Sequence, residues 1–209
     1  MMVSDEERRW LVVGIAMNKV AAPVLRDFIN QGMDTHYANN TYCHGLSSPC
    51  ALNTLAYHYV NADPNLKKLK FRNINNNHNN HGDRKNLYNY NINSSVDLAK
   101  LFLPNYLAEF LGFDESLDMS AILRLLGCNN PAPAFHSPNP LISIQVLAND
   151  VRENVRNKWG HCNVTDWTEV LFNDCFSKLE TLVRSLGLTG GVEKTTLDQL
   201  SDWKAKGTH

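Results

Sequence analysis

The chain has 209 residues, of which 43% are hydrophobic and 20% charged, a composition typical of one globular domain with a buried core. Its 20 lysines and arginines nearly balance its 21 aspartates and glutamates, so no general attraction to nucleic acids or anionic membranes is expected. No apolar run is long enough to cross a membrane. The polar start "MMVSDEERRW" and the odd count of 5 cysteines predict a cytoplasmic chain with reduced thiols and no secretory signal.

The N-terminal segment predicts one long helix followed by a loop. Ser4 and Glu7 have the spacing of a capping box, in which each side chain bonds the other residue's backbone. Apolar residues then recur at helical spacing as far as Phe28. Pro23 lies inside this run, and we expect a kink or break there. The segment 33–48 has no period and is predicted to be a loop.

The middle of the chain predicts short helices around an asparagine-rich insertion. A helix is expected from Ser48-Pro49, a cap followed by proline, to the stop at Asp63-Pro64. The stretch "NINNNHNNHGDRKNLYNYNIN" follows, and we interpret 73–83 as a mobile loop because asparagine side chains compete for helix hydrogen bonds. Further helices are predicted at 95–103, at 105–112 and, between an Asp118 cap and a Gly127 stop, at 119–126.

The C-terminal third carries the clearest helical patterns. After the proline-rich loop 129–140, an apolar stripe predicts a helix from Leu141 to about Trp159. A second helix is predicted after Asp166, which has capping-box spacing to Glu169, and Gly187 ends it. No convincing strand pattern is present, so the predicted fold is an all-α bundle organised around this antiparallel helix hairpin. We expect one domain over 1–188 and a tail over 189–209 with a short helix.

Four polar residues gather at the end of the first hairpin helix. Arg152 and Arg156 lie four residues apart, as do Asn157 and His161, so each pair shares a helix face. Arg156 and His161 are five apart, about 140° around an ideal helix, and converge only if the helix loosens, for which Gly160 is the expected place.

A converged set would suit an RNA phosphodiester. Arginine grips phosphate oxygens, and histidine can take the proton of a 2′-hydroxyl near neutral pH without a metal. The alternative, favoured by spacing alone, is a solvated polar face whose last histidine caps the helix.

The run "RNKWGH" (156–161) on a helix hairpin resembles the motif of HEPN domains, the higher eukaryotes and prokaryotes nucleotide-binding family. The closest resemblance is to the subgroup found in the DAZ-interacting zinc-finger ubiquitin ligase and in invertebrate immune-type multidomain proteins. It extends to the blocks "APVLRDFI" (22–29), "LDMSAILRLLG" (117–127), "NDVRENVRNKWGHCNVTDW" (149–167) and "LETLVRSLGL" (179–188).

This resemblance implies a homodimeric helical bundle that binds single-stranded RNA and, in many members, cleaves it without a metal. It implies Arg156, Asn157 and His161 as catalytic residues. Arg152, Lys158 and Trp159 are the candidate RNA contacts, although a tryptophan at that place also commonly closes the end of a helix pair. Other members keep the fold without cutting, which leaves a self-associating interaction module in an innate-immune or ubiquitin-ligase pathway as the alternative.

No metal or cofactor is expected. His36, Cys43, His44 and Cys50 share the first loop, but Cys-x6-Cys with two histidines does not have the usual spacing of a zinc site. No glycine-rich phosphate loop is present.

Overall fold

The computed structural model describes residues 3–39, 51–128, 135, 137, 143–161 and 163–208. These residues form helices and turns and contain no strand, so the all-α prediction is confirmed. The chain divides into two compact units. Unit 1 comprises Met1–Phe28, Asp118–Gly127 and Phe135–His209, and unit 2 comprises Ile29–Leu117 and Cys128–Ala134. No helix in the described part of the chain is both long and apolar enough to cross a membrane.

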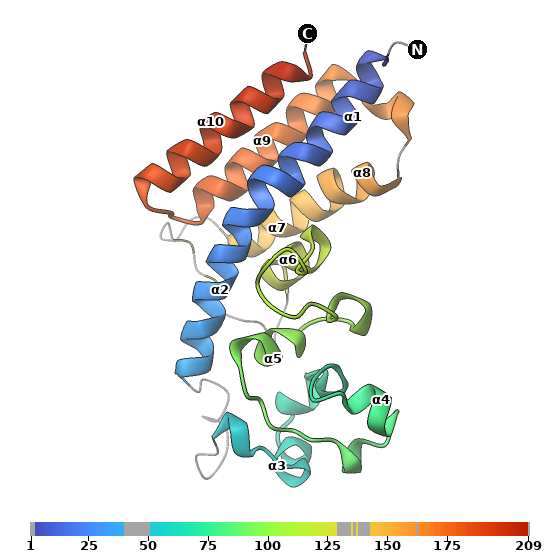
Figure 1. The fold of residues 1–209 in the computed structure, drawn as a ribbon, viewed down its shortest axis with the longest axis vertical. Helices are drawn as coiled ribbons and strands as arrows, with labels where there is room; N and C mark the ends of the chain where they lie inside the picture. The colour runs from blue at the N-terminus through green and yellow to red at the C-terminus, as the bar shows by residue number, and fades with distance from the viewer. Residues whose placement is uncertain are drawn as a thin grey trace. The chain divides into compact units, whose positions relative to one another are not determined.

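Unit 1 is a helical bundle in which α1 lies beside α9 and α10 (Figure 1). Helix α7 packs between α6 and α9, so it is covered on two sides. The helices of this unit are α1 (Asp5–Ile15), the first part of α2 (Ala22–Ala38), α6 (Met119–Leu126), α7 (Ile144–Val151), α8 (Asn157–His161), α9 (Glu169–Ser185) and α10 (Gly190–Lys206).

The predicted capping box begins α1. The Glu7 amide donates to Ser4 Oγ at 3.2 Å, and the Ser4 amide donates to Glu7 Oε2 at 2.8 Å. A π-helical segment, Ala16–Ala21, then joins α1 to α2 just before Pro23. Proline lacks an N–H and crowds the preceding turn of an α-helix, and the wider π turn accommodates it without ending the helix.

Helix α2 runs on to Ala38 and corrects the loop predicted over 33–48, as far as that segment is described. The helical stripe continues through Ile29 and Met33, both fully buried, to Tyr37, whose hydroxyl donates to the Ile92 carbonyl at 3.4 Å. Burial of this stripe in unit 2 stabilises the helix more than the polar composition of the segment favours a loop. The predicted helix start at Ser48-Pro49 lies outside the described residues.

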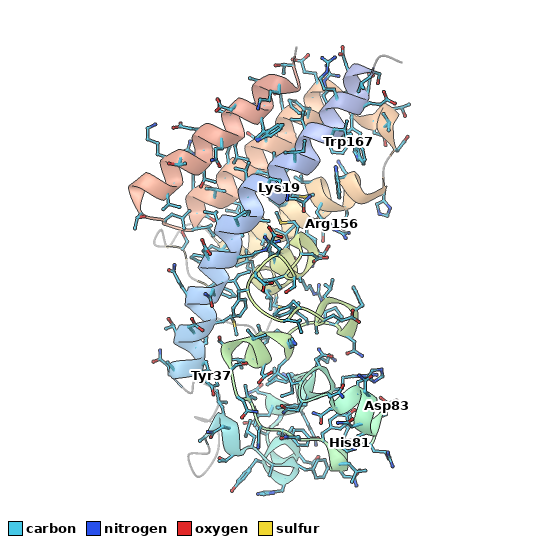
Figure 2. The ribbon with its side chains drawn as sticks, viewed as in Figure 1. Lys19, Tyr37, His81, Asp83, Arg156 and Trp167 are labelled. Atoms are coloured by element: carbon cyan, nitrogen blue, oxygen red, sulfur yellow. The ribbon has the colours of Figure 1, made fainter. Side chains whose placement is uncertain are left out.

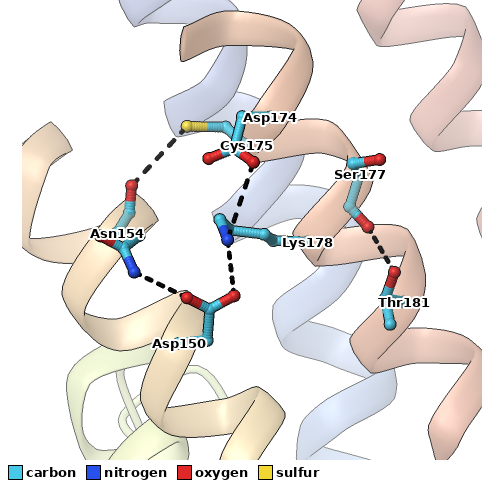
Figure 3. A network of polar contacts seen from close by, with 7 residues as sticks. All are labelled: Asp150, Asn154, Asp174, Cys175, Ser177, Lys178 and Thr181. Atoms are coloured by element: carbon cyan, nitrogen blue, oxygen red, sulfur yellow. Dashed lines mark hydrogen bonds and ion pairs between the residues drawn. The ribbon is translucent and has the colours of Figure 1, made fainter.

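Polar contacts between α7 and α9 show that the two helices are antiparallel (Figure 3). Lys178 Nζ lies 2.7 Å from Asp150 Oδ2, whereas Cys175 Sγ lies 3.9 Å from the Asn154 carbonyl oxygen. The residue numbers of the contacting pairs therefore fall along one helix as they rise along the other. Asn154 also donates to Asp150 Oδ1 at 2.6 Å, so one carboxylate is held by two side chains.

The last two helices differ from prediction at their starts. Thr168, not Asp166, caps α9, because its hydroxyl accepts from the Leu171 amide at 3.3 Å. Helix α9 ends just before Gly187, whose φ of 64° suits a residue without a side chain. The tail expected to hold a short helix instead forms α10, which packs on α1 and α9 with Leu200 fully buried.

Unit 2 is built from short helices and 3-10 turns around an apolar core. Its helices are α3 (Tyr57–Ala62), α4 (Asn77–His81) and α5 (Ser95–Lys100), besides the end of α2. The helix predicted at 105–112 is only a 3-10 turn, Asn105–Leu107. It starts directly after the extended Pro104 and stops at Ala108, where the backbone leaves the helical region.

The segment predicted as a structureless loop, 73–83, is corrected to a turn followed by α4. Its asparagines replace regular backbone pairing with side-chain hydrogen bonds. Asn77 is fully buried, donates to the carbonyls of Phe71 and Asn89 at 2.8 Å each, and accepts from the Asn89 amide at 2.8 Å. Asn75 and Asn76 adopt φ values of 50° and 54°, which asparagine tolerates better than most residues.

Candidate functional site

The predicted site residues occupy a π-helical segment, Arg152–Arg156, and the α8 turn that follows it. The Asn157 amide donates to the Arg152 carbonyl, five residues back, which is the π pattern. The helix therefore loosens before Arg156, and not at Gly160 as the spacing suggested. Gly160 lies inside α8. Such π turns occur frequently at functional sites.

Arg156 and Asn157 are brought together by their side chains. Arg156 Nη1 donates to Asn157 Oδ1 at 3.2 Å. The same nitrogen lies 3.8 Å from the point that a Cβ on Gly160 would occupy. The guanidinium of the half-buried Arg156 therefore lies against the next turn of the helix, beside a residue that has no side chain.

His161 is exposed at the last turn of α8. Asn157 and His161 begin and end this α-helical turn, so they lie on one face at a separation of four residues. The hydrogen bond from Arg156 to Asn157 brings the guanidinium charge towards this face. The imidazole forms no hydrogen bond with any other described residue.

The two flanking cations differ in their surroundings. Arg152 is engaged by its neighbour, with Nη2 3.1 Å from Glu153 Oε1, and its side chain is only 22% exposed. Lys158 is exposed. A surface pair such as Arg152–Glu153 is weak in water, so an incoming phosphate could compete for Arg152.

Trp159 faces the bundle. Its ring stacks on Trp10 of α1 with centroids 5.7 Å apart and planes at 13°. Trp10 Nε1 donates to the Trp159 carbonyl at 3.0 Å, and Gly14 lies so close that a Cβ there would be 2.5 Å from Trp159 Nε1. One face of the ring is thus covered, and Trp159 anchors α8. The prediction that it contacts RNA is not supported by this orientation.

Sequence reasoning placed Trp10 in an apolar stripe and overlooked Gly14 altogether. A small residue one turn after a tryptophan, on a helix that must pack closely, was the available signal. Trp167 is a core residue that is 1% exposed, and its carbonyl accepts from Arg9 Nη1 at 3.4 Å.

No group of three or more histidine, cysteine, aspartate or glutamate side chains among the described residues could hold a metal ion. Of the loop residues considered for zinc, His36 lies in the last turn of α2, and Cys43, His44 and Cys50 lie outside the described residues. Cys175 is fully buried in unit 1, and burial raises the pKa of its thiol to about 12, so it cannot act as a thiolate nucleophile near neutral pH.

Taken together, the candidate site is a series of a half-buried guanidinium, a half-buried carboxamide and an exposed imidazole, on a turn that two stacked tryptophans fix to the bundle. Comparison with protein-family models, with curated proteins and with solved structures found no match.

Proposed function

We propose that this chain is a HEPN-type RNA-binding domain whose contact with the phosphodiester backbone is made by Arg156, Asn157 and His161. The observation that carries the proposal is the Arg156–Asn157 hydrogen bond of 3.2 Å beside the exposed His161. That bond uses one of the five N–H donors of the guanidinium. The others can grip phosphate oxygens, while the exposed imidazole can exchange a proton.

Cleavage is the stronger form of the proposal. His161 would take the 2′-hydroxyl proton as that oxygen attacks the neighbouring phosphorus, and Arg156 would stabilise the charge growing on the phosphoryl oxygens. The new 2′-O–P bond forms as the P–O5′ bond breaks, and the 5′-oxygen takes a proton from water or from a second histidinium. The products are a 2′,3′-cyclic phosphate and a 5′-hydroxyl. A homodimer that brings two such sites together would supply the second histidine.

The first experiment incubates labelled single-stranded RNA with the wild type in EDTA. We expect 2′,3′-cyclic phosphate ends from the wild type and their loss in Arg156→Ala and in His161→Ala. Arg184→Ala is the matched control, because Arg184 is 60% exposed on the opposite end of α9 from the site. Cleavage that survives His161→Ala would refute catalysis at this site. Binding that survives Arg156→Ala at 0.1 M salt would refute the RNA contact.

The second candidate function is a self-associating interaction module. Exposed apolar side chains on the helices of the hairpin favour it, since Val146 of α7 is 65% exposed and Val170 of α9 is 80% exposed. Sedimentation of the wild type and of Val170→Asp distinguishes the two. Dimerisation abolished by Val170→Asp, together with no RNA binding, would favour the module. A role in the cytoplasm, in innate immunity or in ubiquitin transfer is a proposal that rests on the family resemblance alone.

A further inference from the structure

A cavity of about 340 Å³ lies within unit 2, between α3 and the asparagine-rich segment. Its floor is apolar and buried: Leu69, Phe71 and Tyr90 are each 6% exposed or less. Its rim is cationic, because four of its lining residues are basic and one is acidic. In a chain with a net charge of −1, this concentration of positive charge is local.

Aromatic rings and cations alternate around the cavity. Lys70, Phe71 and Arg72 are consecutive, and Lys85 precedes Tyr88 by three residues. The rings form one cluster, in which Tyr90 has its centroid 4.8 Å from that of Phe71, 6.0 Å from that of Tyr88 and 6.1 Å from that of Tyr57. A ligand complementary to this lining must carry its negative charge close to a flat apolar group.

The walls are held by hydrogen bonds, so the cavity is formed before any ligand arrives. Tyr88 donates to the Gly82 carbonyl at 2.5 Å, and Tyr90 donates to the Lys85 carbonyl at 2.7 Å. The buried Asn77 fixes the backbone at Phe71 and Asn89. Burial raises the pKa of Tyr90 to about 12, with Tyr57 and Tyr88 adding to the shift, so this phenol stays neutral and does not repel an anion.

Three of the four cations are available to a ligand. Lys67, Lys70 and Lys85 form no ion pair with any described residue, and all three are exposed. Arg72 is half-buried beside His78, and its Nη1 lies 3.4 Å from Asp83 Oδ1. Asp83 is 89% exposed, and a pair so open to water is weak. The Asp83 carboxylate therefore occupies the position beside Arg72 that a bound phosphate would take. Figure 2 labels Asp83 beside His81.

We propose that this cavity binds an aryl phosphate, with the ring against Tyr57 and Tyr88 and the phosphate held by Lys70, Lys85 and Arg72. Two kinds of ligand carry an aryl phosphate: a free small aromatic phosphate, and a peptide with a phosphotyrosine side chain. The site lies in unit 2 and does not depend on the RNA site of α8. The run "KKLKFR" (67–72), in which cations alternate with apolar residues, was the sequence signal for it.

The test is calorimetric titration of the full chain with phenyl phosphate at low salt. We expect saturable 1:1 binding, weakened about tenfold or more in Lys70→Glu/Lys85→Glu, since reversed charges repel the phosphate. The matched control is Lys68→Glu, an exposed neighbour that does not line the cavity, and it should bind as the wild type does. Asp83→Asn removes the competing carboxylate and should tighten binding about threefold, a gain that misfolding cannot produce.

Further ligands separate the two sources. A short phosphotyrosine peptide that displaces phenyl phosphate assigns the site to peptides. Saturable binding of phenyl phosphate that the peptide does not displace assigns the site to free ligands. The proposal is overturned if neither ligand saturates, if inorganic phosphate binds as tightly as phenyl phosphate, or if Lys68→Glu loses binding equally. Arg156→Ala and His161→Ala should leave this affinity unchanged, so failure here and failure of the RNA proposal are read separately.

Discussion

Two glycines near the proposed RNA site differ in the space that surrounds them. At Gly14 an added Cβ would lie 2.5 Å from Trp159 Nε1, whereas at Gly160 the nearest atom would be Arg156 Nη1 at 3.8 Å. The first distance forces Trp159 to move, and the second is an ordinary contact. These neighbouring positions therefore test whether the tryptophan stack positions α8.

We expect Gly14→Ala to lower the free energy of unfolding by about 1–3 kcal/mol, as overpacking does, and to weaken RNA binding by displacing α8. Gly160→Ala should raise the free energy of unfolding by up to about 1 kcal/mol, because alanine has the higher helix propensity, and should leave the proposed RNA binding unchanged. Urea denaturation and a binding titration on both variants provide the measurement. Equal stability of the two variants would show that Trp159 is free to shift.

At this scale residue spacing predicts which side chains share a helix face better than it predicts where each side chain points. Spacing correctly put Asn157 and His161 on one face, because α8 is a regular α-helix. It did not reveal that Trp159 turns inward, since that depends on Trp10 and Gly14, residues about 150 positions away in the chain. Nor could it locate the π turn, because the hydrogen-bond shift at Arg152–Arg156 has no residue signature of its own.

Between elements, the Asp150–Lys178 pair links α7 to α9. Burial acts to raise the pKa of Asp150, but hydrogen bonds from Lys178 and Asn154 outweigh it and lower the value overall. The hydrogen bond to Asp150 raises the pKa of Lys178. The stabilisation from Asp150 is thus present above about pH 4 and lost as pH falls through its lowered pKa. That from Lys178 is present below about pH 10.4 and lost as pH rises through its raised pKa.

We therefore expect Lys178→Met to cost about 1 kcal/mol at pH 7, after allowance for partial exposure, and to cost progressively less as the pH falls below about 4. Lys194→Met removes the exposed pair with Asp198 and serves as the control, which should not shift the unfolding midpoint. Denaturant midpoints at pH 7 and pH 3 decide the matter. A cost for Lys178→Met that is the same at both pH values would contradict an electrostatic origin.

The asparagine-rich segment makes a second prediction at the scale of elements. Asn77→Ala removes three hydrogen bonds of 2.8 Å, one of which satisfies the carbonyl of the buried Phe71. We expect a loss of about 2–3 kcal/mol, since an unpaired buried group costs about 1–3 kcal/mol and each lost hydrogen bond adds to this. Asn79→Ala, at an exposed site, should be neutral. Thermal melts of the two variants measure the difference, and a neutral Asn77→Ala would restore the loop interpretation of 73–83.

Asparagine composition misled the prediction for a physical reason. The side-chain amide that competes with helix hydrogen bonds can also replace them, and which outcome occurs depends on whether a carbonyl lies within reach. Asn75 and Asn77 find carbonyls at Asn89 and Asn91, which the local sequence does not disclose. By contrast, the caps at Ser4 and Asp118 are local, and both were predicted correctly.

For the whole molecule, helix α2 begins in unit 1 and ends in unit 2. Leu25 is fully buried in the first and Met33 in the second. A helix of about ten residues is marginal by itself in water, so each half of α2 depends both on packing in its own unit and on helical continuity with the other half. We expect the two units to unfold in one transition, followed by tryptophan fluorescence and by near-ultraviolet dichroism of the tyrosines. Midpoints that differ between the two signals would show independent units.

The distribution of aromatic residues has a practical consequence. The tryptophans, at 10, 159, 167 and 203, all belong to unit 1, and every described tyrosine, at 37, 57, 59, 88, 90 and 106, belongs to unit 2. The protein thus carries an intrinsic optical label for each proposed ligand. RNA docking at α8 would perturb the stacked Trp10–Trp159 pair and leave the phenol bands unchanged, and an aryl phosphate would do the reverse. The tryptophan and tyrosine signals of the unlabelled protein therefore report which of the two proposed sites a ligand occupies.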